Sequence, residues 1–87
     1  MLPIEQLLHR IKWDAEFGKG AFAIGYYDRV AHAERIVPFA SIDLRPGEAS
    51  FSFDEDGIAA HIPLHRVRTV YKDGAVIWQR PAPHVGD

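Results

Sequence analysis

The sequence contains no cysteine among its 87 residues. Disulfide bonds, a thiolate nucleophile and the usual cysteine-bearing zinc sites are therefore excluded. Long apolar runs are also missing, since none approaches the roughly 18 residues of a membrane-spanning helix, and no signal peptide is visible. We therefore expect a cytoplasmic protein with no membrane contact and no cofactor.

The chain also lacks a strongly basic charge, because its Lys and Arg are slightly outnumbered by Asp and Glu and its formal net charge is −2. Affinity for long nucleic acid grows with the number of phosphates neutralised, so a tight grip on a long strand is not expected. The charge is uneven, however. Residues 41–60 hold Asp43, Glu48, Asp54, Glu55 and Asp56 against Arg45, whereas residues 61–87 hold Arg66, Arg68, Lys72 and Arg80 against Asp73 and Asp87. A basic end of this kind can still bind a single phosphate.

The length allows one domain, which we place at residues 3–81, with residues 82–87 as a flexible tail. Apolar residues at three- and four-residue spacing predict a helix over residues 3–12. Short alternating segments follow at 22–28, 35–37, 51–53 and 58–62, before a final hairpin. The pattern predicts an α+β fold in which the N-terminal helix packs on an antiparallel meander of about five to six short strands.

The last third of the chain predicts a β-hairpin with a basic face. The Asp-Gly pair at 73–74 favours a tight turn, because glycine accepts a positive φ at no steric cost. Side chains alternate along a strand, so Arg66, Arg68 and Lys72 are expected on one face. Such a surface has the chemistry to hold a phosphate.

His65, Arg66 and Arg68 are the first candidates for a phosphate site. Each guanidinium offers forked donors that match phosphate oxygens. His65 can donate to the same phosphate when protonated, or act as an acid or base. The structural alternative is a corner histidine that caps backbone beside two solvated arginines, and the residues alone leave both interpretations open.

Tyr27, Asp28 and Arg29 form a second polar group. Asp28 can pair with Arg66 or Arg29 and so aim a guanidinium at a ligand. The alternative is an ordinary salt bridge across strands, which contributes little at a surface.

The two tryptophans can each stack a base, which contributes about 1–3 kcal/mol per base in single-strand binding. In so small a domain a tryptophan also serves as core. We expect core for Trp13 and leave Trp78 open. His61 and His65 are separated by Pro63, which rules out a helical pair of metal ligands.

Four short motifs in series resemble a known family. They are Ile11-Lys12-Trp13-Asp14, then Ile24-Gly25-Tyr26-Tyr27-Asp28-Arg29, then Val37-Pro38-Phe39, and then Ile62-Pro63-Leu64-His65-Arg66-Val67-Arg68 leading to Asp73-Gly74-Ala75-Val76-Ile77-Trp78-Gln79-Arg80. Their order and spacing over residues 3–81 resemble the RNA cyclic-group-end recognition domain family. The last motif reads Trp78-Gln79-Arg80 where Trp-Asp-Arg is typical of that family.

The resemblance implies a small module that binds a terminal RNA phosphate, including a 2′,3′-cyclic one, in RNA processing or repair. The residues that would bind the phosphate are Arg29, His65, Arg66, Arg68 and Arg80, and those that would stack the base or support the site are Tyr27, Asp28 and Trp78.

Two other functions stay open at this stage. One is a metal-free phosphodiesterase or cyclase with His65 as general base, for which the spacing singles out no second proton-transfer group. The other is a protein-interaction module or homodimer that pairs through an edge strand near residues 37–38 or through the last hairpin.

Overall fold

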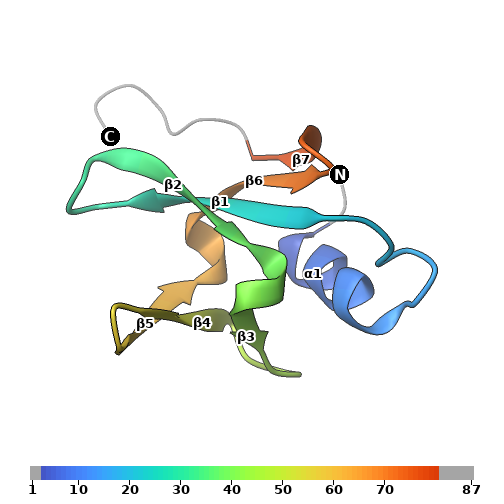
Figure 1. The fold of residues 1–87 in the computed structure, drawn as a ribbon, viewed down its shortest axis with the longest axis horizontal. Helices are drawn as coiled ribbons and strands as arrows, with labels where there is room; N and C mark the ends of the chain where they lie inside the picture. The colour runs from blue at the N-terminus through green and yellow to red at the C-terminus, as the bar shows by residue number, and fades with distance from the viewer. Residues whose placement is uncertain (1–2, 81–87) are drawn as a thin grey trace.

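The structure is a computed structural model, and residues 3–80 of it are described here (Figure 1). The elements are α1 (Ile4–Trp13), β1 (Phe22–Asp28), β2 (Ala33–Pro38), η1 (Phe39–Ser41), β3 (Ile42–Leu44), β4 (Ser50–Glu55), β5 (Ile58–Pro63), η2 (Leu64–Arg66), β6 (Val67–Lys72) and β7 (Ala75–Gln79). One helix followed by antiparallel strands confirms the predicted α+β class, with seven strands in place of five to six. The tail predicted at residues 82–87 lies outside the described residues.

Helix α1 forms where the apolar stripe predicted it. Leu7, Leu8 and Ile11 are its buried residues. The helix ends at Trp13 and is capped by Asp14, whose backbone N–H donates to the Arg10 carbonyl and whose carboxylate accepts from the backbone N–H groups of Glu16 and Phe17. Within residues 3–80 no helix is long and apolar enough to cross a membrane.

The strands form two antiparallel sheets in place of one continuous meander. The four-stranded sheet has the order β2-β1-β6-β7, and the three-stranded sheet has the order β3-β4-β5. Strands close in sequence pair as predicted. The pairing of β1 with β6, which sets Ile24 opposite Val70, joins distant parts of the chain. Along the chain the second sheet is thus inserted between β2 and β6, which lie on either side of β1 in the first sheet.

Two prolines carry the chain from one sheet to the other. Pro38 ends β2 and Pro63 ends β5, and each is followed by one turn of 3₁₀ helix. A proline has no N–H for the next ladder hydrogen bond, so each strand stops there. The second of these turns, η2, delivers His65 and Arg66 directly before β6.

The core lies between the two sheets, and α1 packs beside them (Figure 1). Tyr26 of β1 packs edge-on against Phe51 of β4, with ring centroids 6.2 Å apart. The side chains that are almost completely buried are Phe51, Leu8, Ile24, Leu44, Val67 and Val70. Both sheets therefore share one core.

The expectation that Trp13 belongs to this core is wrong, because its side chain is 52% exposed. Trp13 comes two residues after Ile11, and two residues turn a helix by about 200°, so its side chain leaves the buried stripe. Its ring lies beside that of His9, with centroids 5.0 Å apart.

Candidate functional site

Topology brings the predicted arginines to one end of the four-stranded sheet. At this end Asp28 is opposite Ala33, Tyr26 is opposite Val67, and β7 finishes at Gln79. The arginines here are Arg29 in the β1–β2 turn, Arg66 in η2, Arg68 in β6 and Arg80 after β7. We call this group the arginine end.

The four arginines of the arginine end make no ion pair with an acidic residue among residues 3–80. Ion pairs within residues 3–80 involve Arg10, Lys19, Arg35 and Arg45 as cations. None of these pairs includes Arg29, Arg66, Arg68 or Arg80. Guanidinium donors that face no carboxylate stay available for an anion from solution.

Arg68 lies over the Tyr27 ring, with its guanidinium carbon 5.5 Å from the ring centroid. The Tyr27 hydroxyl is 3.5 Å from Nδ1 of His32. Arg68 Nε is buried and has no hydrogen-bond partner among the described residues. A buried donor left in this state costs about 1–3 kcal/mol, so an added acceptor would be favourable here.

Arg80 is held mainly by backbone. Its Nε donates to the Val67 carbonyl at 2.9 Å, and its Nη2 donates to the Leu64 carbonyl at 3.5 Å. Leu64 begins η2 and Val67 follows it, so Arg80 holds the turn that presents His65 and Arg66. The predicted phosphate contact of Arg80 must compete with these bonds.

His65 is exposed and Arg66 is half-buried on the same turn. Within the part of the chain that the structure describes, neither side chain makes a hydrogen bond or an ion pair. Among the described residues, therefore, no hydrogen bond or ion pair of His65 competes with its predicted contact to a ligand.

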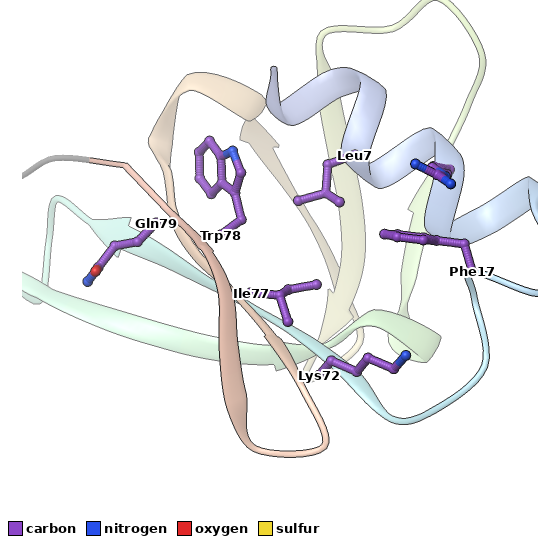
Figure 2. Close-up of a pocket in the computed structure, with 7 residues that line it drawn as sticks. Leu7, Phe17, Lys72, Ile77, Trp78 and Gln79 are labelled. Carbon is purple, nitrogen blue, oxygen red and sulfur yellow. The ribbon is translucent and has the colours of Figure 1, made fainter. Parts of the chain in front are cut away.

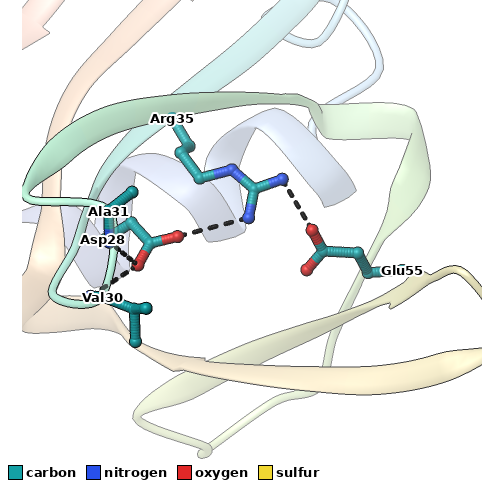
Figure 3. Close-up of polar contacts among 5 residues, drawn as sticks. All are labelled: Asp28, Val30, Ala31, Arg35 and Glu55. Atoms are coloured by element: carbon teal, nitrogen blue, oxygen red, sulfur yellow. Dashed lines mark hydrogen bonds and ion pairs between the residues drawn. The ribbon is translucent and has the colours of Figure 1, made fainter.

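The predicted pairing of Asp28 with Arg29 or Arg66 is not observed. The Asp28 carboxylate accepts hydrogen bonds from the backbone N–H groups of Val30 and Ala31 at 2.8 and 3.1 Å, and it pairs with Arg35 at 3.3 Å (Figure 3). These backbone bonds, Ala31 first, lower the pKa of Asp28, and Arg35 adds to the effect. Asp28 therefore shapes the β1–β2 turn and leaves Arg29 unpaired.

Arg35 was not singled out from the sequence, yet it joins the two sheets. Its Nη2 lies 2.6 Å from Oε1 of Glu55 in β4, and this bond raises the pKa of Arg35 (Figure 3). Arg35 and buried Val37 are two residues apart in β2, so their side chains lie on the same face of the strand. This spacing is the sequence signal that Arg35 faces the other sheet. Its partner Glu55 could be known only once the sheets were packed.

The predicted basic face of Arg66, Arg68 and Lys72 is also corrected. Arg66 lies in η2, outside the strand. The β1–β6 register shifts between Gly25, opposite Thr69, and Tyr26, opposite Val67, so Arg68 is the extra residue of a β-bulge. A bulge breaks the alternation of side chains. Lys72 lies at the far end of β6.

Trp78 lies in the core with 7% of its surface exposed. Its strand position is opposite Val70, and the Arg80 guanidinium lies 5.3 Å from its ring centroid. Trp78 therefore exposes little surface on which a base could stack, and its ring contacts the Arg80 guanidinium. Tyr27 is the better candidate for a base.

A further polar cluster on the outer face of this sheet had no sequence signal. The Glu34 carboxylate accepts hydrogen bonds from Thr69 at 3.3 Å and from the Tyr71 hydroxyl at 3.0 Å. The bond to Glu34 raises the pKa of Tyr71. A Cβ at Gly25 would lie 2.5 Å from Oε2 of Glu34, so the glycine makes room for this cluster.

Comparison with known proteins finds a family model that matches the chain. The family model described as MJ1316 RNA cyclic group end recognition domain matches residues 1–80. No curated protein matches the chain, and no solved structure does. The match spans both sheets, η2 and the arginine end. The chain therefore belongs to the MJ1316 RNA cyclic group end recognition domain family, whose name ties it to the recognition of RNA ends.

Proposed function

We propose that the arginine end binds the terminal phosphate of an RNA 3′ end, including a 2′,3′-cyclic phosphate, during RNA processing or repair in the cytoplasm. The observation that carries the proposal is that Arg29, Arg66, Arg68 and Arg80 gather at one sheet end with no acidic partner among residues 3–80. The family name supports RNA ends as the source of the phosphate.

The described contacts give each residue of the arginine end a different role in the proposal. Arg66 and Arg29 are the unpaired cations that contact phosphate oxygens, and Arg68 adds the positive charge of the guanidinium that lies over Tyr27. His65, exposed on η2, reaches the phosphate or the ribose hydroxyl. Arg80 positions η2 through the Leu64 and Val67 carbonyls.

The stacked Tyr27 and Arg68 provide the platform for the terminal base. Aromatic rings and guanidinium planes both stack on bases without reading their sequence, and each stacked base contributes about 1–3 kcal/mol. We therefore expect preference for the chemical group at the end and little preference for the base that carries it.

The test is binding of short RNAs that differ only at the 3′ end, as 2′,3′-cyclic phosphate, 3′-phosphate or 3′-hydroxyl. Fluorescence anisotropy at two salt concentrations would report affinity and the number of phosphates contacted. We expect at least about tenfold tighter binding of one phosphorylated end, and loss of that preference in Arg66→Ala. Arg45→Ala, which removes an exposed arginine from the loop between β3 and β4, is the matched control and should bind as the wild type does.

Equal affinity for all three ends, with a steep salt dependence, would overturn the proposal in favour of non-specific electrostatics. Equal loss in Arg66→Ala and Arg45→Ala would also overturn it, because the charge would then act without a site.

A further inference from the structure

A groove runs between α1 and the β6–β7 hairpin (Figure 2). Its volume of about 560 Å³ falls within the range of small-molecule sites. Its lining residues are Leu7, Arg10, Phe17, Lys72, Ile77, Trp78 and Gln79. Figure 2 shows Leu7 and Phe17 on the helix side facing Ile77 and Trp78 on the hairpin side, with Lys72 below them.

The groove combines an apolar floor with cations. Arg10 lies over the Phe17 ring, 4.4 Å from its centroid, and its Nε is 3.7 Å from the Asp14 carboxylate. Lys72 lies 5.7 Å from the Phe22 ring centroid and makes no ion pair within residues 3–80. An occupant that complements this lining carries a flat, largely apolar group next to negative charge.

The groove is continuous with the arginine end. Trp78 lines the groove, and the Arg80 guanidinium lies 5.3 Å from the Trp78 ring centroid. Lys72 and Val67 stand at opposite ends of β6, about 17 Å apart at the usual rise per residue. One nucleotide cannot reach both places, whereas a short single strand can.

Resting on the proposed function, we infer that this groove is a second subsite for the same RNA. It holds a nucleobase on the 5′ side of the bound end, while Lys72 and Arg10 contact the adjoining phosphates. Single-strand binding surfaces combine cations that follow the backbone with apolar or aromatic floors that receive bases. The end group would then be recognised at one place and the strand at another.

The experiment is a length series of RNAs with the same phosphorylated 3′ end, from one to about six nucleotides. For the wild type we expect affinity to rise by about tenfold along the series. In the double variant Arg10→Gln and Lys72→Gln the rise should disappear, while the preference for the phosphorylated end stays. Arg45→Gln is the matched control, because Arg45 is exposed and paired with Asp43 as Arg10 is paired with Asp14.

A second variant tests the apolar floor without touching a charge. Ile77 is 42% exposed, so Ile77→Ser leaves the core in place, and we expect it to reduce the length-dependent gain by severalfold. If Ile77→Ser changes the oligomeric state and leaves the length dependence intact, the groove is a protein contact and the inference is overturned.

The two proposals fail in different ways. Affinity that is independent of length, with end preference intact, overturns the second subsite and leaves the first. A gain with length that persists in the double variant also overturns the second subsite. Absence of end preference at every length overturns the proposed function itself.

Discussion

The two sheets share one core but differ in charge. The four-stranded sheet gathers Arg29, Arg66, Arg68 and Arg80 at one end with no described acidic partner, whereas the three-stranded sheet and its turns hold five acids against Arg45. Arg45 is paired with Asp43 at 3.3 Å. Tyr26 and Phe51 pack across the same core from the two sides. Packing alone does not require this separation of charge. The separation favours the approach of an anion to one end of the molecule.

The largest expected effect comes from breaking the shared core. Phe51 is 1% exposed and contacts both Tyr26 and Phe53, so Phe51→Ala should cost about 3–5 kcal/mol of unfolding free energy. Urea denaturation followed by far-UV circular dichroism and by Trp78 fluorescence, in a Trp13→Phe background, would measure it. The urea midpoints of both signals should decrease together. Trp78 belongs to the other sheet, so a common decrease means that the two sheets unfold as one unit.

Ile58→Ala is the control for this variant, because Ile58 is 72% exposed in the same sheet and should cost less than about 0.5 kcal/mol. A Trp78 transition left unchanged by Phe51→Ala would show that the sheets unfold separately.

The outer face of the four-stranded sheet is tested by Gly25→Ala. The new methyl group would displace the Glu34 carboxylate from Thr69 and Tyr71, and the loss of two hydrogen bonds should cost about 1–2 kcal/mol. Thermal denaturation would measure the change.

Glu34→Ala supplies the other arm of a double-mutant cycle. Once the carboxylate is gone the methyl group meets no obstacle, so Gly25→Ala should add almost nothing in that background. Additive losses would show that Gly25 is needed for another reason.

The charge contrast itself is tested on the acidic sheet. Asp54→Lys together with Glu48→Lys changes the formal net charge from −2 to +2, a difference of two charges for each of two sites. At low salt we expect binding of 3′-hydroxyl RNA to strengthen by about threefold or more, which narrows the preference for phosphorylated ends. Fluorescence anisotropy would measure this affinity. The double variant Asp54→Asn with Glu48→Gln removes the two negative charges without adding positive ones, and so separates the two effects. An unchanged preference would mean that the acids do not contribute to selectivity.

The smallest expected effect concerns Asp28. The folded state lowers its pKa, so its contribution to stability is present above the ordinary carboxyl pKa and is lost as the pH falls through the lowered value. Asp28→Asn should lower the melting temperature slightly at pH 7 and less at a more acidic pH, because protonation of the wild-type carboxyl removes the difference in charge. Scanning calorimetry at both pH values would show it, with Asp54→Asn as control. An equal difference at both pH values would mean that the charge of Asp28 does not matter.

Local structure could be predicted from particular residues. The stripe from Ile4 to Ile11 predicts α1, the Asp-Gly pair at 73–74 predicts a turn in which both residues have positive φ, and Pro38 and Pro63 predict strand ends. Each of these signals depends on neighbours only a few residues away. The family resemblance and the basic character of the last third also lie in the sequence itself.

The candidate site needed the folded chain. No local pattern sets β1 beside β6, and without that pairing Arg29 and Arg68 have no reason to lie at one end. Asp28 pairs with Arg35 in the folded chain. Packing of the two sheets places the Arg35 guanidinium between the carboxylates of Asp28 and Glu55. A bulge at Arg68 broke the alternation on which the predicted basic face rested.

The sequence by itself therefore determined the helix, the turn of the last hairpin, the prolines that end strands and the supply of cations in the last third of the chain. Only the tertiary structure decided that Trp13 is exposed and Trp78 buried, that the four arginines lie at one end of a sheet, and that a groove lies between α1 and the last hairpin. The physical reason is range. Backbone preferences and side-chain periodicity act over a few residues, whereas burial and charge pairing depend on which distant segments share the core.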